Sequence, residues 1–224
     1  MGGKSMGKSK SKIVRENILN RWSITPDELT VAIDDNPSLR GMLLGYVAEY
    51  KLRSMWFTGR PSITLYVKHD DHDRKKKGDL VVTYRERSFI IESKSLQTHS
   101  IRREGDAWIG KAQCDASDRK TVTFADGSTL ETTCLLTGEF DILAVNLFAF
   151  ENQWRFVFAK NSDLPRSTYK KYTPEQQAKL LASLVSVSWP PQPPFSDEPY
   201  SLMDEMLKTS SSGGPSRRDT SRKR

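Results

Sequence analysis

Three residues in the middle of the chain have types and spacing suited to phosphodiester hydrolysis. Asp79 is followed, after twelve residues, by Glu92-Ser93-Lys94. Side chains on a β-strand alternate between its two faces, so Glu92 and Lys94 point to the same side of a strand. Two carboxylates can hold Mg²⁺, which polarises a phosphate and lowers the pKa of a bound water. A lysine there positions the water and stabilises developing charge, and the two acids favour its protonated form.

A β-hairpin is the element that must bring these residues together. Alternating and apolar runs predict two strands joined by a tight turn at Glu86-Arg87. That turn places Asp79 opposite Lys94 and diagonal to Glu92, at roughly 7–8 Å between backbones. Both strands are apolar on both faces, which is typical of a central, buried hairpin. The alternative is a solvated hairpin with interstrand ion pairs. We prefer the catalytic interpretation because buried acids are costly unless paired or metal-bound.

The pattern Gly78-Asp79 followed by Glu92-Ser93-Lys94 resembles the PD-(D/E)xK motif of nucleases with a restriction-endonuclease-like fold. Gly78 stands where the motif has proline, at a position that does not bind metal. The resemblance implies an α/β fold, with a mixed central β-sheet flanked by helices. It also implies a Mg²⁺-dependent DNA endonuclease that acts on double-stranded DNA as a homodimer. Within these families the chain looks most like a Type II restriction endonuclease.

In such families a helix before the hairpin often supplies a further acid to the metal site. The matching helix here is residues 38–57, and the matching acid is Glu49. The resemblance therefore gives Asp79, Glu92 and Glu49 as metal ligands and Lys94 as their catalytic partner. The alternative for Glu49 is an exposed helix residue without a catalytic role.

The remaining elements follow from apolar periodicity, capping residues and turn signals. Thr25-Pro26 and Thr173-Pro174 predict helix starts, and Asp126-Gly127 predicts a hairpin turn. The predicted strands are residues 62–68, 79–85, 88–94, 121–124, 129–135, 140–150 and 154–159, and the later predicted helices are residues 107–119, 173–185 and 200–208. This order predicts an α/β domain with a mixed sheet.

The charge of the chain lies mainly at its ends. The chain has 224 residues and a net charge of +7, and residues 1–16 and 209–224 each carry five basic residues and one acidic residue. The rest is close to neutral, which argues against histone-like coating of DNA. We expect residues 1–12 to be a disordered basic arm and 209–224 a disordered basic tail. Between them we expect a single nuclease domain, 13–188, and a Pro-rich connector with a short helix, 189–208.

Basic residues on both sides of the hairpin are candidates for phosphate contacts. They are Lys75, Lys76, Lys77, Arg102, Arg103, Lys160, Arg166, Lys170 and Lys171. For the run at 75–77 a solvated charge cluster is an equal alternative. The acidic and histidine-rich stretch at 69–73 is better interpreted as a solvated loop than as a metal site.

Several protein classes are disfavoured. No apolar run approaches the ~20 residues of a membrane-spanning helix, and no apolar segment typical of a secretory signal follows the basic start. Cys114 and Cys134 form neither a disulfide framework nor a Cys-x-x-Cys zinc pair, which favours a reducing, cytoplasmic setting. Three alternatives stay open: a structure-specific repair or junction-resolving nuclease, a catalytically silent nucleic-acid-binding module, and a small adaptor with basic arms.

Overall fold

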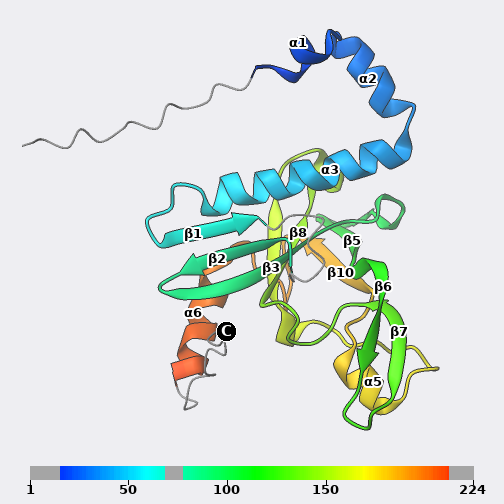
Figure 1. Cartoon of the computed structure of the whole chain (residues 1–224), viewed down its shortest axis with the longest axis vertical. Coiled ribbons are helices and arrows are strands. Elements are labelled where there is room, and N and C mark those ends of the chain that lie inside the picture. The colour runs from blue at the N-terminus through cyan, green and yellow to red at the C-terminus, as the bar shows by residue number, and fades with distance from the viewer. Residues whose placement is uncertain (1–15, 69–77, 212–224) are drawn as a thin grey trace, which may run out of the picture. The chain divides into compact units, whose positions relative to one another are not determined.

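The computed structural model describes residues 16–68 and 78–211, and the chain divides into two compact units, residues 1–44 and 45–224. Figure 1 shows the elements by label. They are α1 Ile18–Trp22, α2 Pro26–Asp34, α3 Pro37–Leu52, a π-helical turn Arg53–Phe57, β1 Ile63–Lys68, β2 Leu80–Tyr84, β3 Arg87–Ser95, a short 3₁₀ turn Thr98–Ser100, β4 Arg102–Glu104, β5 Ala107–Gln113, β6 Asp115–Thr123, β7 Thr129–Cys134, β8 Ile142–Asn146, α4 Phe148–Glu151, β9 Phe156–Lys160, a 3₁₀ turn Asn161–Asp163, α5 Pro174–Lys179, β10 Leu184–Trp189 and α6 Tyr200–Ser211.

The first unit contains α1, α2 and the start of α3. The predicted helix start at Thr25 is confirmed. Its hydroxyl accepts a hydrogen bond from the Glu28 N–H at 3.2 Å, and the Glu28 carboxylate accepts one from the Thr25 N–H at 2.8 Å. This capping box satisfies N–H groups that have no partner inside the helix. Neither α1 nor α2 has a buried residue, so these two helices contribute no apolar core.

A five-stranded sheet with the order β1-β2-β3-β8-β9 forms the centre of the second unit. The sheet is mixed, because β3 and β8 run parallel while the other neighbouring pairs run antiparallel. The predicted α/β fold class with a mixed central sheet is therefore confirmed. The predicted central hairpin is also confirmed: it is β2 and β3, and β3 is the middle strand of the five.

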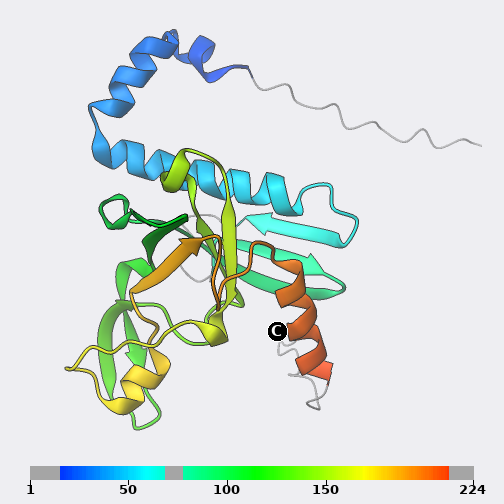
Figure 2. The same cartoon turned by 180° about the vertical axis from the view of Figure 1, so that it is seen from behind.

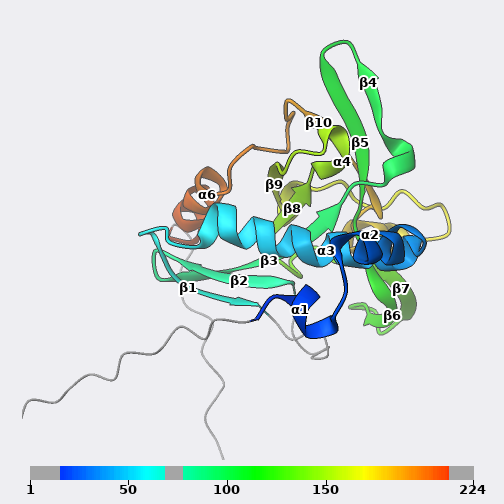
Figure 3. The ribbon, with the colours of Figure 1, turned by 90° about the horizontal axis from the view of Figure 1, so that it is seen from above.

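Two apolar layers cover the two faces of this sheet. On one face, Ile91 and Phe158 pack with Leu52 from the end of α3 and Met203 from α6. Figure 3 shows where α6 and the end of α3 lie relative to the strands. On the other face, the side chains of β8 and β9 pack against β5 and β10 of a three-stranded sheet ordered β10-β5-β4 (Figure 2). Because the strands alternate, each central strand is apolar on both faces, as the sequence predicted. Glu92 and Lys94 of β3 belong to neither layer, so apolar packing does not account for them.

The helix predicted over residues 107–119 is wrong, because this segment forms strands β5 and β6. Strand β5 pairs with β10 and β4, and its small buried residues alternate as Gly110 and Ala112. A Cβ on Gly110 would lie only 3.1 Å from the Phe150 ring, so the strand approaches the core closely at this point. Alanine, lysine and glutamine favour a helix locally, but pairing within the three-stranded sheet outweighs that preference.

Two further boundaries differ from the prediction. The helix that Thr173 caps ends at Lys179 instead of 185, and Leu184–Trp189 forms β10. The strand predicted over 140–150 ends at Asn146, where the side-chain oxygen accepts a hydrogen bond from the Phe148 N–H at 2.9 Å and helix α4 follows. In the first case a strand replaces the end of a predicted helix, and in the second a short helix replaces the end of a predicted strand.

The chain continues to pack beyond the Pro-rich segment. Phe195 is 7% exposed, Met203 is fully buried, and Ser196 exchanges two backbone hydrogen bonds of 2.8 Å with Phe158. The helix predicted over 200–208 is confirmed as α6. Cys114 and Cys134 are both buried and free. None of the helices in the described ranges combines the length and apolar character needed to cross a membrane.

Candidate active site

The register of the β2–β3 hairpin sets the position of every residue in the site. The turn residues are Arg85 and Glu86, both with positive φ, and Leu80 lies opposite Ile91. The turn predicted at Glu86-Arg87 is therefore wrong by one residue. Positive φ at both central positions is typical of a two-residue hairpin turn that matches the twist of the strands. Arg87 belongs to β3, where its guanidinium donates a hydrogen bond to the Met206 carbonyl at 2.8 Å.

The corrected register moves Asp79 away from the position opposite Lys94. The Asp79 N–H donates to the Ile91 carbonyl at 3.0 Å, and Asp79 Oδ2 accepts a hydrogen bond from the Ser93 N–H at 2.7 Å. These two bonds fix Asp79 against β3, beside Glu92, which lies between the two bonded residues Ile91 and Ser93. The backbone N–H of Ser93 thus holds an acid that the motif identifies as functional.

Glu92 and Lys94 lie on the same face of β3, as predicted. Lys94 Nζ is 2.8 Å from Glu92 Oε1, and the two side chains are 19% and 12% exposed. Burial raises the pKa of Glu92, and the nearby Asp79 charge raises it further against the opposing effect of Lys94. Burial lowers the pKa of Lys94, but the charges of Glu92 and Asp79 outweigh burial and the net direction is upward. Lys94 is therefore protonated at neutral pH, which suits an electrostatic role and not that of a general base.

Gly78 explains the departure from proline in the motif. Its φ is +70°, and a Cβ at this position would lie 2.4 Å from Ile90 Cγ2 and 3.0 Å from the Ile91 carbonyl oxygen. Proline is restricted to a φ near −65°, so it cannot occupy this conformation. The glycine lets the chain turn tightly against β3, and this turn delivers Asp79 to its hydrogen bond with Ser93.

Glu49 lines a small cavity together with Asp79. The cavity has a volume of about 50 Å³ and is lined by Tyr46, Glu49, Tyr50, Leu52, Arg53, Asp79, Leu80 and Ser93. A space of this size holds a few waters or an ion with part of its hydration shell. Glu92 is not part of this lining, so the cavity brings together Glu49 and Asp79 but not the third predicted acid.

The three predicted acids do not form one cluster. Within the described residues, no three side chains of the His, Cys, Asp and Glu types are close enough together to hold a metal ion. The structure instead gives two pairs of acids that share Asp79. Two carboxylates are sufficient for Mg²⁺, which normally keeps several of its waters. The donor set of Asp79 and Glu92 fits that preference, and Glu49 fits a role in holding waters in the cavity.

Lys94 also lines a second, wide polar hollow, which is separate from the cavity beside Glu49. Its volume is about 690 Å³, and its lining includes Lys94, Gln97, His99, Gln113 and Asp115. Gln97 donates a hydrogen bond to Gln113 at 3.1 Å, which fixes the segment after β3 against β5. Lys94 thus faces a space large enough for part of a nucleic acid backbone.

Of the predicted DNA-binding residues, three lie outside the described part of the chain, and two make several polar contacts within the protein. Lys75, Lys76 and Lys77 fall outside the described residues. Lys160 pairs with Glu205 at 2.9 Å and Asp163 at 3.2 Å. Arg166 donates hydrogen bonds to the carbonyls of Leu164 at 2.6 Å and Ser162 at 3.0 Å, which closes the turn after β9. The bonds of Arg166 favour a structural role for this residue.

The other four are on exposed segments. Arg102 and Arg103 lie on β4, where Arg102 pairs with Glu104 at 2.5 Å and Arg103 lies 5.8 Å from the centre of the Trp108 ring. Lys170 and Lys171 line a surface hollow of about 560 Å³ with Tyr169. The structure therefore places these basic residues on two separate surfaces, and their contact with DNA stays a prediction.

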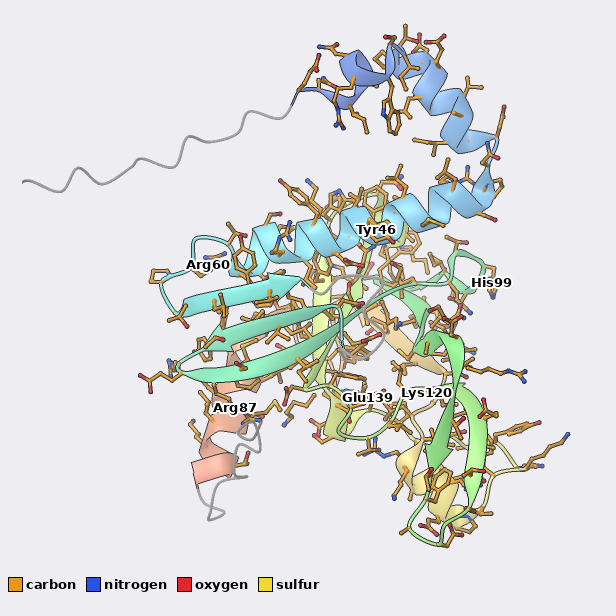
Figure 4. All side chains as sticks on the ribbon, viewed as in Figure 1. Tyr46, Arg60, Arg87, His99, Lys120 and Glu139 are labelled. Carbon is orange, nitrogen blue, oxygen red and sulfur yellow. The ribbon has the colours of Figure 1, made fainter. Side chains whose placement is uncertain are left out.

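Sequence reasoning missed a second lysine–glutamate pair near the site. Lys120 Nζ lies 2.6 Å from both carboxylate oxygens of Glu139, joining β6 to the segment before β8 (Figure 4). Nineteen residues separate the two, so no local spacing could have indicated the pair. A second group was also missed, although its spacing could have indicated it. Tyr46, Tyr50 and Arg53 follow the i, i+4, i+7 spacing of one helix face, and Glu49 lies among them in the sequence.

Comparisons with known proteins add little to this geometry. No protein-family model matches the chain, and no curated protein matches it. Among solved structures, the chain is similar to a bacterial homing endonuclease, I-Ssp6803I, at 12% sequence identity and a TM-score of 0.33, covering 76% of this chain and 96% of that one. At this identity and TM-score the similarity supports no conclusion about function. Membership of the PD-(D/E)xK families stays a prediction.

Proposed function

We propose that the chain is a metal-dependent endonuclease that hydrolyses phosphodiester bonds in double-stranded DNA. One observation supports this function above the others: the Glu92–Lys94 pair, with a second acid close enough to raise the pKa of Glu92. Holding Asp79, which directly precedes β2, against Glu92 on the middle strand of the sheet costs free energy without a cation between the two acids. That cost is typical of a site selected for function.

In this proposal Asp79 and Glu92 hold Mg²⁺, and Glu49 orients waters in the cavity beside Asp79. The ion, when bound, would polarise the phosphate and acidify a water. Lys94 stays protonated, so its ammonium group stabilises negative charge that develops on the phosphate. The Ser93 N–H holds one oxygen of Asp79 and leaves the other available as a ligand.

The finer proposal is a sequence-specific enzyme of the Type II restriction kind that cuts as a homodimer. It is supported by the motif and by the central position of the hairpin in the sheet. The structure-specific nuclease and the silent binding module are the alternatives.

The test is cleavage of plasmid DNA by the full-length protein with Mg²⁺. We expect cleavage by the wild type, and a loss of about 10³-fold or more for Asp79→Ala and Lys94→Ala. EDTA should abolish cleavage and added Mg²⁺ should restore it. Discrete fragments would support sequence specificity, and nicking confined to branched or unpaired DNA would support the structure-specific alternative.

Glu139→Gln is the matched control, because its carboxylate has a similar exposure, is paired with Lys120 and is not one of the proposed metal ligands. Its cleavage per folded molecule should stay near the wild-type value. Cleavage that survives both Asp79→Ala and Lys94→Ala would show that the site is assigned incorrectly.

A further inference from the structure

Two exposed tyrosines and a half-buried arginine form a cluster beside the carboxylate cavity. The Arg53 guanidinium carbon lies 5.7 Å from the ring centres of both Tyr50 and Tyr66. Tyr50 is 57% exposed and Tyr66 is 38% exposed. These three residues are referred to below as the tyrosine–arginine platform.

The end of α3 explains how the platform forms. The chain passes from α3 into a π-helical turn, in which the Thr58 N–H donates to the Arg53 carbonyl at 2.9 Å. In this wider turn Phe57 is 1% exposed and Trp56 packs edge-on against Phe158 at 5.2 Å. The two aromatic residues of the turn thus anchor it to the core, while Arg53 remains between the helix and strand β1. Turns of this type are frequent at functional sites.

The platform is not part of the apolar core, although the apolar spacing of the helix includes Tyr46 and Tyr50. Ala48 and Leu52 are the buried residues of α3, whereas Tyr46 and Tyr50 lie on its exposed side. Exposed tyrosine rings with an arginine stacked between them are chemically suited to nucleobases. Stacking of a base on an aromatic side chain contributes about 1–3 kcal/mol, and arginine adds a cation–π contribution.

The position of the platform connects it to the proposed reaction. Tyr50 and Arg53 line the same cavity as Glu49 and Asp79, and Figure 4 labels Tyr46 on the same helix. A base stacked there would lie beside the acid proposed to hold the metal. Bases within a duplex have both faces covered by their neighbours, so only an unpaired base can stack on Tyr50 or Tyr66.

We propose that the tyrosine–arginine platform binds an unpaired nucleobase of the substrate next to the phosphate that is cut. This inference rests on the proposed nuclease function and names its substrate class: DNA with unpaired nucleotides, or a duplex from which one base is flipped out. Both sources predict tighter binding where pairing is already broken, because the cost of unpairing is then avoided.

The experiment measures binding of the full-length protein to labelled oligonucleotides in EDTA, so that cleavage does not interfere. Three probes share one sequence: a fully paired duplex, the same duplex with an unpaired bulge, and the bulged duplex with abasic nucleotides in the bulge. We expect the bulged duplex to bind about tenfold more tightly than the paired one, within a range of about 5–150-fold. The abasic probe should lose this preference, because it keeps the flexible backbone but has no base to stack.

Three variants assign the preference to the platform. The double variant Tyr50→Ala, Tyr66→Ala should bind paired and bulged DNA equally, whereas Tyr50→Phe should keep the preference because the ring remains. Tyr169→Ala is the matched control: Tyr169 is 51% exposed and lines a different hollow together with two lysines. It should leave the ratio of the two affinities unchanged.

Three results would overturn the proposal: equal affinity of the wild type for all probes, tight binding of the abasic probe, or a preference that persists in the double variant. Self-association of the wild type that the double variant loses, without a base preference, would assign the platform to contact with a second copy and also overturn it. A base preference without cleavage of any DNA in Mg²⁺ would leave the platform standing and refute the nuclease. Cleavage without a base preference would refute the platform and leave the proposed nuclease function standing.

Discussion

Two lysine–glutamate pairs in this unit have similar burial and different surroundings. Glu139 is 13% exposed and Glu92 is 12% exposed, and each is within 3 Å of a lysine. Glu139 also accepts a hydrogen bond from the Leu136 N–H at 2.9 Å, and both of its oxygens contact Lys120. Glu92 contacts Lys94 through Oε1 and has the Asp79 carboxylate as a further neighbour.

The difference indicates what each pair does. The oxygens of Glu139 accept hydrogen bonds from Lys120 and from a backbone N–H. These bonds offset the free-energy cost of burying the ion pair, which joins two elements. Glu92 is held by Lys94 through one oxygen, and burial together with the nearby Asp79 charge raises its pKa, which favours binding of a cation. We interpret the Lys120–Glu139 pair as structural and the Glu92–Lys94 pair as functional.

The largest expected effect would separate the pairs by activity. Glu92→Gln removes a proposed metal ligand while keeping the shape of the side chain, and plasmid cleavage should fall by about 10³-fold. Glu139→Gln should change cleavage per folded molecule by less than about threefold, a difference below 1 kcal/mol. Equal losses in both variants, measured with folded protein quantified by circular dichroism, would contradict the assignment.

Stability should separate the pairs in the opposite sense. Lys120→Met leaves Glu139 largely buried without its cation, and we expect a loss of about 2–3 kcal/mol in the free energy of unfolding, measured by urea denaturation. Arg102→Met is the control, because the Arg102–Glu104 pair is more than half exposed. Its loss should stay below about 1 kcal/mol. A Lys120→Met loss as small as that of the control would show that the pair does not join the two elements.

The turn that positions Asp79 gives a further comparison. Gly78→Ala adds a Cβ 2.4 Å from Ile90 at a positive φ, whereas Gly127→Ala adds one at a similar φ with no atom within 4 Å. The φ strain of about 1–2 kcal/mol is common to both, and overpacking adds about 1–3 kcal/mol at Gly78 alone. Urea denaturation should therefore show the larger loss for Gly78→Ala, which should also cleave less DNA per folded molecule. Equal losses would mean that the close approach to β3 is relieved without cost.

The smallest expected effect is a pH dependence of stability in metal-free protein. The folded state raises the pKa of Glu92, so in the pH range between its ordinary and raised values the folded protein binds more protons than the unfolded chain. Stability should therefore fall as pH rises through that range, and Glu92→Gln should lack this fall. Urea midpoints measured across the range in EDTA would show it. A stability that rises relative to Glu92→Gln would reverse the direction assigned to Glu92.

Cys114 lies close to Lys94 and gives a simple check on the burial of the site. Burial raises the pKa of the Cys114 thiol to about 12. We expect no reaction with a thiol reagent at neutral pH in the native protein, and reaction after unfolding. Rapid native modification of Cys114, identified by mass spectrometry, would indicate that this side of Lys94 opens to solvent.

Local signals predicted the elements that local interactions determine. The cap at Thr25, the cap at Thr173 and the central hairpin all follow from residues within a few positions of one another. The helix predicted over 107–119 failed because β5 gains its stability from β10, which lies more than 70 residues later. The hairpin register failed by one residue because Arg87 is held in β3 by Asp141 and Met206, which are distant in sequence.

The sequence by itself determined that Glu92 and Lys94 share a face of one strand, because alternation is a property of the extended backbone. It also determined that Asp79 lies at the start of the partner strand, directly before Leu80, because an apolar run follows it. Only the tertiary structure decided that Glu49 and Asp79 line one cavity, which Glu92 does not line. It also decided that Tyr50 is exposed and Arg53 half-buried beside that cavity. These relationships depend on how the end of α3, residues 45–52, packs in the second unit, and periodicity within the helix does not specify which of its apolar residues are buried in the core.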